Sequence, residues 1–335
     1  MEWRPAVLHR PRGDRVQCLL CPLRCTLSDG ESGPCGVRRR NGAELETATF
    51  ATTVRHLDAV ERKPLFHYRP GSHCLTLAAP GCTFRCDYCI NHRVSQYGRD
   101  PGVRWTGAPV DAAAVVADAA AERAAVALSY TEPSLALELT LALAESGRPL
   151  GVPVLWKSNG FLTPEAVELA AGAVAAVNVD LKTVDEARHL ELTGARVGPV
   201  LETLRGLYER GVWLEVSTPL IPGISAAPEE LRPIAEAVAA LGPGVPWHLG
   251  RVSPAYRRTG HAPTPPADLA AGVRVGREAG LHHVYVERAL GADGRATRCP
   301  HCRAVLVERG IWSLERNRIE SGACPSCGTA VDGRW

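Results

Sequence analysis

The 335-residue sequence has no long apolar run and no excess of either charge. No run approaches the roughly 18 residues of a membrane-spanning helix, and the opening MEWRPAVLHRPRGDRV lacks the apolar core of a signal peptide. Lysine and arginine total 38 against 36 aspartate and glutamate residues, so no nucleic-acid or anionic-membrane surface is indicated. We therefore expect a cytoplasmic protein that does not bind membranes.

The glycine-rich loops of the common nucleotide-binding folds are also missing. No lysine-tipped phosphate loop and no G-x-G-x-x-G follows the first strand-like run, CLTLAAP at 74–80. A nucleotide site of the Walker or Rossmann type is therefore unsupported. The sequence has no short repeat of the solenoid type either.

Between about residues 73 and 290, strand-like apolar runs alternate with helix-like segments. This alternation indicates an α/β fold with a parallel sheet, although periodicity does not decide between a doubly wound sheet and a barrel. Two of the helix-like segments begin at Thr-Pro-Glu or Pro-Glu-Glu, as helix starts prefer. We expect strands at 74–80, 124–130, 152–158, 175–181, 212–221, 246–252 and 282–288, and helices within 133–147, 163–173 and 228–242.

The 12 cysteines mark three parts of the chain. Four lie in an irregular segment at 1–72, three lie near the start of the central region at 73–290, and four lie in the C-terminal part at 291–335. Cys74 stands outside these clusters. Tight C-x2-C spacing in a cytoplasmic chain favours metal ligands over disulfides, so we expect metal-binding modules on both sides of a central domain.

The central triplet, Cys82, Cys86 and Cys89, lies in GCTFRCDYCIN directly after the first predicted strand. Zinc sites usually have four protein ligands, and a ferredoxin run has a fourth cysteine nearby. Three thiolates on a four-iron cluster leave one iron open to a small molecule. Ligands of parallel α/β folds bind at the carboxyl ends of strands, where this loop lies. The alternatives are a chance spacing or a zinc site completed by His92.

The triplet spacing C-x3-C-x2-C, with Tyr88 before the last cysteine, resembles the radical S-adenosylmethionine (SAM) superfamily. A string of further motifs resembles the AmmeMemoRadiSam-system radical SAM enzymes, which are relatives of pyruvate formate-lyase activating enzymes. Departures from the family pattern, such as Ile90 and Thr131, indicate a divergent paralogue with a different substrate. The motifs are ERKPLFHYRPGS (61–72), SYTEP (129–133), SNGFLTPE (158–165), VNVDLK (177–182), GVWLEVSTPLIPG (211–223) and HHVYVE (282–287).

The resemblance implies a partial (β/α)6, TIM-like barrel with a [4Fe-4S] cluster on Cys82, Cys86 and Cys89. It also implies SAM bound at the open iron, and a flavodoxin- or ferredoxin-type electron donor. SAM would be cleaved to methionine and a 5′-deoxyadenosyl radical, since such cofactors supply the difficult chemistry themselves.

The resemblance also assigns cofactor contacts to five residues: Tyr88, Glu132, Asn159, Asp180 and Lys182. Glu132 would lie near the amino group of SAM, and its alternative role is that of an acid at a helix N-terminus. Asp180 and Lys182 alternate along one predicted strand and point to the same face. They would contact the ribose or the carboxylate of SAM, and the alternative is a purely structural ion pair.

We predict catalytic roles for three further residues, Lys157, Glu215 and His248. Glycyl-radical activating enzymes resemble this region but have an acid beside a bound cation where this chain has Lys157. An ammonium near Asp180 would replace that cation, and the alternative is a solvated lysine at a strand end. Glu215 and His248 lie on later predicted strands. His248 is preferred to Arg251 because their odd separation places them on opposite faces of a regular strand.

Two further four-cysteine clusters flank the central region. The tail has two C-P-x-C knuckles separated by 21 residues, Cys299, Cys302, Cys324 and Cys327, which predict a zinc ribbon, with rubredoxin-like iron as the alternative. The head has Cys18, Cys21, Cys25 and Cys35 in C-x2-C-x3-C-x9-C spacing. Four thiolates satisfy either zinc or an auxiliary iron–sulfur cluster, and the spacing leaves both open.

The sequence therefore predicts a radical SAM enzyme that abstracts hydrogen from an unidentified substrate, either a small molecule or a macromolecule. One alternative is an activating enzyme of a glycyl-radical enzyme. An alternative of another class is a non-catalytic, metal-stapled adaptor that binds protein or nucleic acid. The adaptor would need a fourth ligand near the triplet or a basic stripe, and neither is evident in the sequence.

Overall fold

The computed structural model describes residues 2–335 and is built around one eight-stranded sheet. Each predicted apolar run forms one strand, and neighbouring strands in this series pair in parallel. An extra strand, β8 (Arg55–Ala59), pairs antiparallel with β9. The parallel strands are β9 (His73–Leu77), β11 (Ala125–Leu128), β12 (Val154–Ser158), β13 (Val174–Asp180), β14 (Trp213–Leu220), β15 (Trp247–Arg251) and β16 (Val284–Val286).

The sheet is a partial barrel, as predicted. Its order runs from β16 through β15, β14, β13, β12, β11 and β9 to β8, and among residues 2–335 the two outer strands do not pair with each other. The sheet begins at residue 55, inside the segment expected to be irregular and separate. The expected boundary at residue 73 therefore lies within the sheet. An antiparallel strand can follow a short turn, so no helix-like segment precedes β9 in the sequence to indicate the extra strand.

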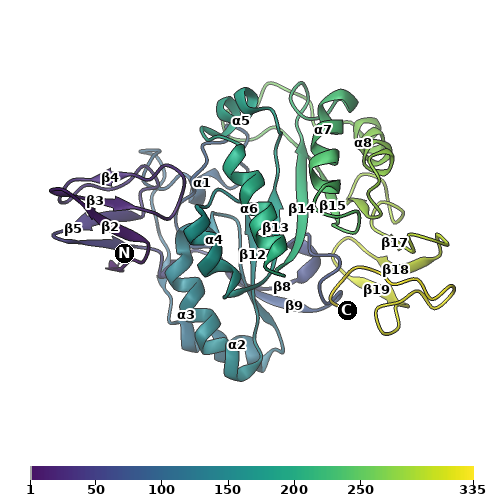
Figure 1. Ribbon diagram of the computed structural model, residues 1–335, viewed down its shortest axis with the longest axis horizontal. Coiled ribbons are helices and arrows are strands. Elements are labelled where there is room, and N and C mark those ends of the chain that lie inside the picture. Colours follow the sequence, from purple (N-terminus) through teal and green to yellow (C-terminus); the bar gives the residue numbers. More distant parts are fainter. Residues whose placement is uncertain (1) are drawn as a thin grey trace.

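Helices cover the outer face of the sheet, and Figure 1 shows α4, α6 and α7 on one side of the strands. Thr163 begins α4 because its hydroxyl accepts the amide of Ala166, with Pro164 at the first helical position. The helices are α1 (His92–Ser95), α2 (Ala112–Ala121), α3 (Leu137–Gly147), α4 (Pro164–Ala171), α5 (Glu186–Thr193), α6 (Gly198–Glu209), α7 (Pro228–Ala239) and α8 (Pro266–Glu278). The 3-10 helices are η1 (Val60–Arg62), η2 (Pro133–Ala136) and η3 (Arg148–Leu150).

Alanines occupy part of the inner face of the sheet, and residues 60–68, here called the plug, pack against them toward the amino ends of the strands. Leu65 and Tyr68 of the plug share a buried cluster with Ala125, Ala127 and Ala176 of the sheet. Alanine on this face leaves room for a segment of main chain, whereas the outer face has the larger apolar residues that pack under the helices. The interior of the barrel is therefore filled by the plug near the amino ends of the strands and open at their carboxyl ends.

The head folds into two small antiparallel sheets, ordered β2-β3-β4 and β1-β6-β5, rather than staying irregular. The buried Arg38–Glu138 ion pair joins the head to α3. The strands of this part are β1 (Arg4–Pro5), β2 (His9–Arg12), β3 (Arg15–Cys18), β4 (Thr26–Leu27), β5 (Arg38–Asn41), β6 (Glu44–Thr47) and β7 (Ala51–Thr52), and β7 pairs with β10 (Ala108–Pro109).

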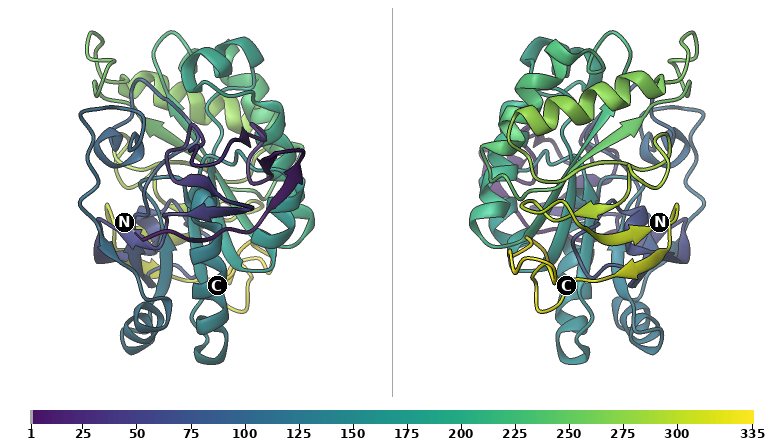
Figure 2. Two further views of the ribbon diagram at one scale, coloured as in Figure 1. Left: turned by 90° about the vertical axis from the view of Figure 1, so that its left-hand side faces the viewer. Right: turned by 90° about the vertical axis from the view of Figure 1, so that its right-hand side faces the viewer.

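The C-terminal tail forms its own sheet of β17 (Thr297–Arg298), β18 (Val305–Arg309) and β19 (Leu314–Asn317). Arg309 donates to the carbonyl of Phe66 at 2.5 Å, and the amide of Arg334 donates to the carbonyl of His67 at 2.7 Å. The tail thus binds the plug directly. Head and tail lie at opposite ends of the long axis, with the sheet between them (Figures 1 and 2). No helix within residues 2–335 has both the length and the apolar character needed to cross a membrane.

Candidate active site

The carboxyl ends of the parallel strands surround one open cleft of about 390 Å³. This volume lies within the roughly 300–1,000 Å³ of small-molecule sites. Each parallel strand contributes a lining residue at or just beyond its end, as expected for a barrel. The contributors include Cys82, Cys86, Tyr88 and Cys89 after β9, Glu132 after β11, Lys157 and Asn159 from β12, Asp180 and Lys182 from β13, Pro219 from β14, Arg251 from β15 and Glu287 after β16.

The triplet Cys82, Cys86 and Cys89 brings three thiols to this cleft, and no other cysteine and no histidine of residues 2–335 lines it. His92, the alternative fourth ligand, instead has its Nδ1 3.2 Å from the Cys89 carbonyl oxygen and stacks on Tyr256, with 4.5 Å between ring centroids. Burial raises the pKa of Cys86 to about 11, so a metal must displace protons when it binds. The donor set fits a [4Fe-4S] cluster with one open iron.

Glu132 organises the turn after β12. Its buried carboxylate accepts hydrogen bonds from the Ser158 hydroxyl at 2.7 Å, the Asn159 amide at 2.8 Å and the Ser134 amide at 3.0 Å. Burial raises its pKa, which those hydrogen bonds oppose. Glu132 therefore caps η2 and positions its neighbours, and its contact with the amino group of SAM stays a prediction.

Asn159 extends from this turn toward the triplet. Its side-chain amide donates to Thr83 Oγ1 at 2.8 Å and to Cys82 Sγ at 3.6 Å. Gly160 follows in the left-handed region, with φ of 70°, and a Cβ there would lie 2.8 Å from Val179 Cγ1. The turn therefore requires glycine at this position, and that requirement fixes where the Asn159 side chain lies.

Asp180 lies between two ammonium groups. Lys182 Nζ is 3.0 Å from one carboxylate oxygen, and Lys157 Nζ contacts the other as well as Asn178 Oδ1 at 2.6 Å. Burial opposes ionisation, but both lysines outweigh it and lower the pKa of Asp180 to about 2. The Lys182 ammonium also lies 5.7 Å from the ring centroid of Tyr88. Four of these residues form one cluster that lines the cleft: Tyr88, Lys157, Asp180 and Lys182.

The chain contains only three lysines, and all three lie in the interior of the barrel. Lys157 and Lys182 pair with Asp180, and Lys63 of the plug donates to Asp58 at 2.8 Å. All other basic residues apart from histidine are arginine. Because an ammonium is a compact point charge, it suits positions where the cation must fit between fixed acceptors.

Glu215 and His248 do not line the cleft, in contrast to the expectation that they contact substrate. Glu215 accepts the amides of Phe66 at 2.9 Å and His67 at 2.8 Å, and its carboxylate lies 2.6 Å from His248 Nε2. Both side chains point to the inner face as predicted, but at the depth that the plug fills. Arg251 lines the cleft instead, because it is the last residue of β15, where the strand ends and its alternation no longer sets the direction of the side chain.

The sequence predicted no role for Arg62, Ser129 and Tyr130, which also line the cleft. Tyr130 adopts a left-handed backbone conformation, with φ of 69°, and its hydroxyl lies 3.2 Å from His56 Nε2. Strained backbone of this kind clusters at functional sites. Arg62 comes from the plug, so only the tertiary fold places it here.

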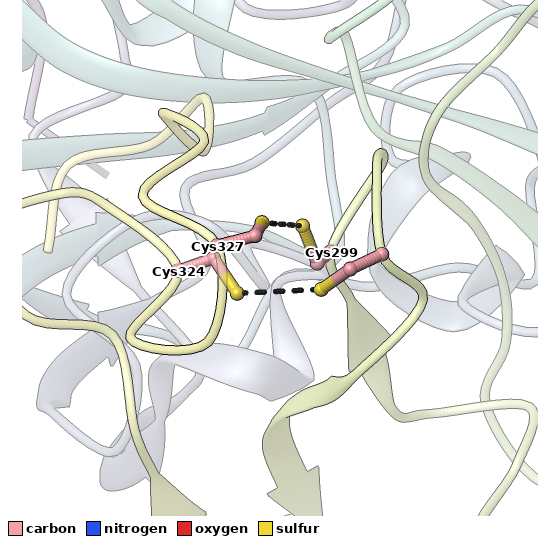
Figure 3. Close-up of side chains that lie close together, drawn as sticks. Cys299, Cys324 and Cys327 are labelled. Carbon is pink, nitrogen blue, oxygen red and sulfur yellow. Dashed lines mark hydrogen bonds between the residues drawn. The ribbon is translucent and has the colours of Figure 1, made fainter.

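The tail cysteines converge on a single point. The thiols of Cys299 and Cys327 are 3.6 Å apart, those of Cys302 and Cys324 are 3.7 Å apart, and all four lie within 4.8 Å of one another. Figure 3 labels three of these side chains, which point toward one another from two loops. Metal–sulfur bonds of about 2.3 Å in a tetrahedral site place thiolates about 3.8 Å apart, so this set is shaped for one metal ion. Zinc remains the prediction for that ion.

Comparison with known proteins agrees with this geometry. Residues 77–236 match the family model described as the radical SAM superfamily. An uncharacterised protein of Methanocaldococcus jannaschii is 30% identical over 336 residues, which cover 98% of this chain and 99% of that protein. The isethionate sulfite-lyase activating enzyme of Oleidesulfovibrio alaskensis is 30% identical over 118 residues, 35% of this chain and 38% of that enzyme.

The benzylsuccinate synthase activating enzyme of Thauera aromatica is 30% identical over 112 residues, 33% of this chain and 34% of that enzyme. Among solved structures, a domain of pyruvate-formate lyase-activating enzyme from Bacteroides vulgatus aligns with 48% of this chain and 98% of that domain, at 21% identity and a TM-score of 0.41. Superfamily membership implies a [4Fe-4S] cluster and SAM as cofactors. The chain belongs to the radical SAM superfamily and is related to the activating enzymes of glycyl-radical enzymes.

Proposed function

We propose that this protein cleaves SAM reductively in the cleft and uses the resulting radical to take hydrogen from a substrate. The observation that carries the proposal is the meeting of the triplet thiols with Asn159, Asp180 and Lys182 around one cavity. When bound, the [4Fe-4S] cluster supplies one electron to the sulfonium of SAM, so that a carbon–sulfur bond breaks and methionine and a 5′-deoxyadenosyl radical form.

The residues of the chain would hold the cluster and orient SAM. Cys82, Cys86 and Cys89 would hold the cluster, and the cleft beside them would hold SAM. Asn159 donates toward Cys82, and such donors tune the potential of a cluster. Asp180 and Lys182 offer an acceptor for hydroxyls and a donor for a carboxylate on the floor of the cleft.

Lys157 holds the Asp180 carboxylate from the side opposite Lys182, which supports its role as a built-in replacement for a bound cation. Arg62 and Arg251 line the cleft and favour an anionic or strongly polar substrate, although Arg62 also pairs with Asp58 at 2.7 Å. A one-electron donor of the flavodoxin or ferredoxin type would reduce the cluster.

A second candidate is activation of a glycyl-radical enzyme. It is supported by the similarity to activating enzymes, although each match spans only about a third of those enzymes. Mixing the reduced protein and SAM with isethionate sulfite-lyase tests it, because activation would give a protein glycyl radical detectable by EPR. Formation of 5′-deoxyadenosine without that signal would argue for another substrate.

The main proposal is tested by anaerobic reconstitution with iron and sulfide, followed by dithionite and SAM. We expect 5′-deoxyadenosine and methionine from the wild type and from Cys74→Ala, which removes a cysteine outside the clusters. Cys86→Ala should retain the fold, lose the cleft cluster and form no product. A loaded cluster that yields no 5′-deoxyadenosine in the wild type would overturn the proposal.

A further inference from the structure

The four head cysteines line a single cavity of their own. Cys18 ends β3, Cys21 and Cys25 lie in the loop between β3 and β4, and Cys35 precedes β5. The thiols therefore come from two hairpins that close on each other. Apolar side chains complete the wall of this cavity: Leu20, Leu23, Leu27 and Leu135.

The spacing of the head thiols differs from that of the tail thiols. The tail set lies within 4.8 Å, as a single tetrahedral ion requires, whereas no such compact group exists among the head cysteines of the described chain. An iron–sulfur cluster contains its own irons and sulfides, so its thiolates stand farther apart around a larger body. The head cysteines agree with that wider spacing, since all four line one cavity and no three of their thiols lie within 4.8 Å of one another.

A buried cation supports this assignment. Arg38 is 1% exposed and donates to Cys18 Sγ at 3.5 Å, while its other nitrogen is paired with Glu138. Hydrogen bonds to sulfur and an apolar surround both set the potential of an iron–sulfur centre. The same guanidinium offsets part of the negative charge of four thiolates.

Adjacent residues of one loop line the head cavity and the cleft. Thr83 lines the head cavity, and its neighbour Cys82 lines the cleft. Arg99 ties the two sides together, because it donates to the carbonyls of Pro34 at 2.6 Å and of Phe84 at 2.7 Å. The head cysteines and the triplet are thus held in one rigid unit.

Three glycines allow this close approach. A Cβ on Gly81 would lie 3.0 Å from the Cys35 carbonyl oxygen, and one on Gly36 would lie 2.8 Å from Gly98 Cα. All three glycines have positive φ values, between 73° and 90°. Main chain therefore contacts main chain between the head and the triplet loop, which keeps side chains out of the gap.

We propose that Cys18, Cys21, Cys25 and Cys35 hold an iron–sulfur cluster that passes electrons to the cluster on the triplet. Each transfer moves one electron: a reduced flavodoxin- or ferredoxin-type protein is oxidised as the head cluster is reduced, and the head cluster is oxidised as the triplet cluster is reduced. No bond or proton is exchanged. The site assignment stands on the head cysteines alone, whereas the relay rests on the proposed function of the triplet.

Metal counting tests the site on the whole protein. After anaerobic reconstitution we expect about eight irons and about one zinc per chain. The double variant Cys25→Ala/Cys35→Ala should lose about half of the iron and keep the zinc, whereas Cys74→Ala should keep both. About four irons and about two zincs in the wild type would overturn the assignment. The wild-type count decides the question even if the double variant does not fold.

The relay is tested by the rate at which reduced flavodoxin reduces the triplet cluster, followed by EPR. We expect the double variant to be reduced several-fold more slowly than Cys74→Ala, with unchanged SAM binding in equilibrium dialysis. Equal rates would overturn the relay. An iron count near eight without any 5′-deoxyadenosine would contradict the proposed function and leave the head cluster in place, so the two failures are distinguishable.

Discussion

Lys157 is the most accessible of the three lysine side chains, with 21% of its surface exposed against 8% for Lys182 and 2% for Lys63. Reductive methylation followed by mass spectrometry should therefore label Lys157 first among the lysines. Bound SAM should suppress that labelling, because Lys157 lines the cleft. Labelling that is unaffected by SAM in the reconstituted protein would remove Lys157 from the cofactor site.

Asp180 gives the site a defined dependence on pH. Its pKa is lowered to about 2 in the folded protein, so the stabilisation it provides is complete above its unfolded pKa of about 4 and is lost as the pH falls toward 2. Asp180→Asn should cost about 1–2 kcal/mol in the unfolding free energy of the apoprotein at pH 6.

The difference between wild type and Asp180→Asn should shrink as the pH falls from about 4 toward 2, in urea titrations at each pH. A difference that stays constant over this range would mean that the carboxylate is not held by Lys157 and Lys182 in solution. The same measurement on Lys157→Met should show a smaller loss that is complete at a higher pH, because one of the two ammonium groups that lower the folded-state pKa of Asp180 is gone.

At the scale of elements, the turn after β12 depends on Gly160. Gly160→Ala meets both a positive φ and a contact of 2.8 Å with Val179, whereas Gly211→Ala meets a similar φ of 77° with open space around it. We expect the first variant to lose about 2–4 kcal/mol of stability and the second about 1 kcal/mol. Only Gly160→Ala should weaken SAM binding, since the turn carries Asn159.

The plug depends on Glu215. Glu215→Gln replaces one acceptor oxygen by a donor amide facing the Phe66 and His67 amides, so we expect a loss of about 3 kcal/mol in denaturant unfolding. Glu209→Gln, on the exposed surface of α6, is the matched control and should change stability by less than about 0.5 kcal/mol. Lost catalysis with unchanged stability would return Glu215 to a catalytic role.

At the scale of the whole molecule, the tail closes the bottom of the barrel through Arg309 and Arg334. Because the metal holds the tail together, Cys327→Ser should release it, free the plug and lower the thermal midpoint by about 5–10 °C. Cys74→Ala should retain the metal and so separates its loss from a general effect of removing a cysteine. An unchanged midpoint with the metal gone would show that the tail folds without it.

The fold was largely predictable because its pattern is local. Seven apolar runs gave seven strands, and caps such as Thr163 gave the helix starts. β8 escaped prediction because its residues, Arg55–Ala59, are mostly polar and exposed at the sheet edge. The two head sheets escaped because their strands are short and pair only across the chain.

The site, like the fold, was predictable from the sequence only in part. The sequence by itself determined which thiols are close, because Cys82, Cys86 and Cys89 share one short loop, and which face Asp180 and Lys182 present, because strands alternate. Only the tertiary structure decided how far from the cleft each inward-facing side chain lies. The plug fills the lower interior and takes Glu215 and His248 out of the cleft, while it brings Arg62 in. The tertiary structure also decided that the head cysteines lie against the triplet loop. Contacts across such sequence distances depend on packing and leave no periodic signal in the sequence.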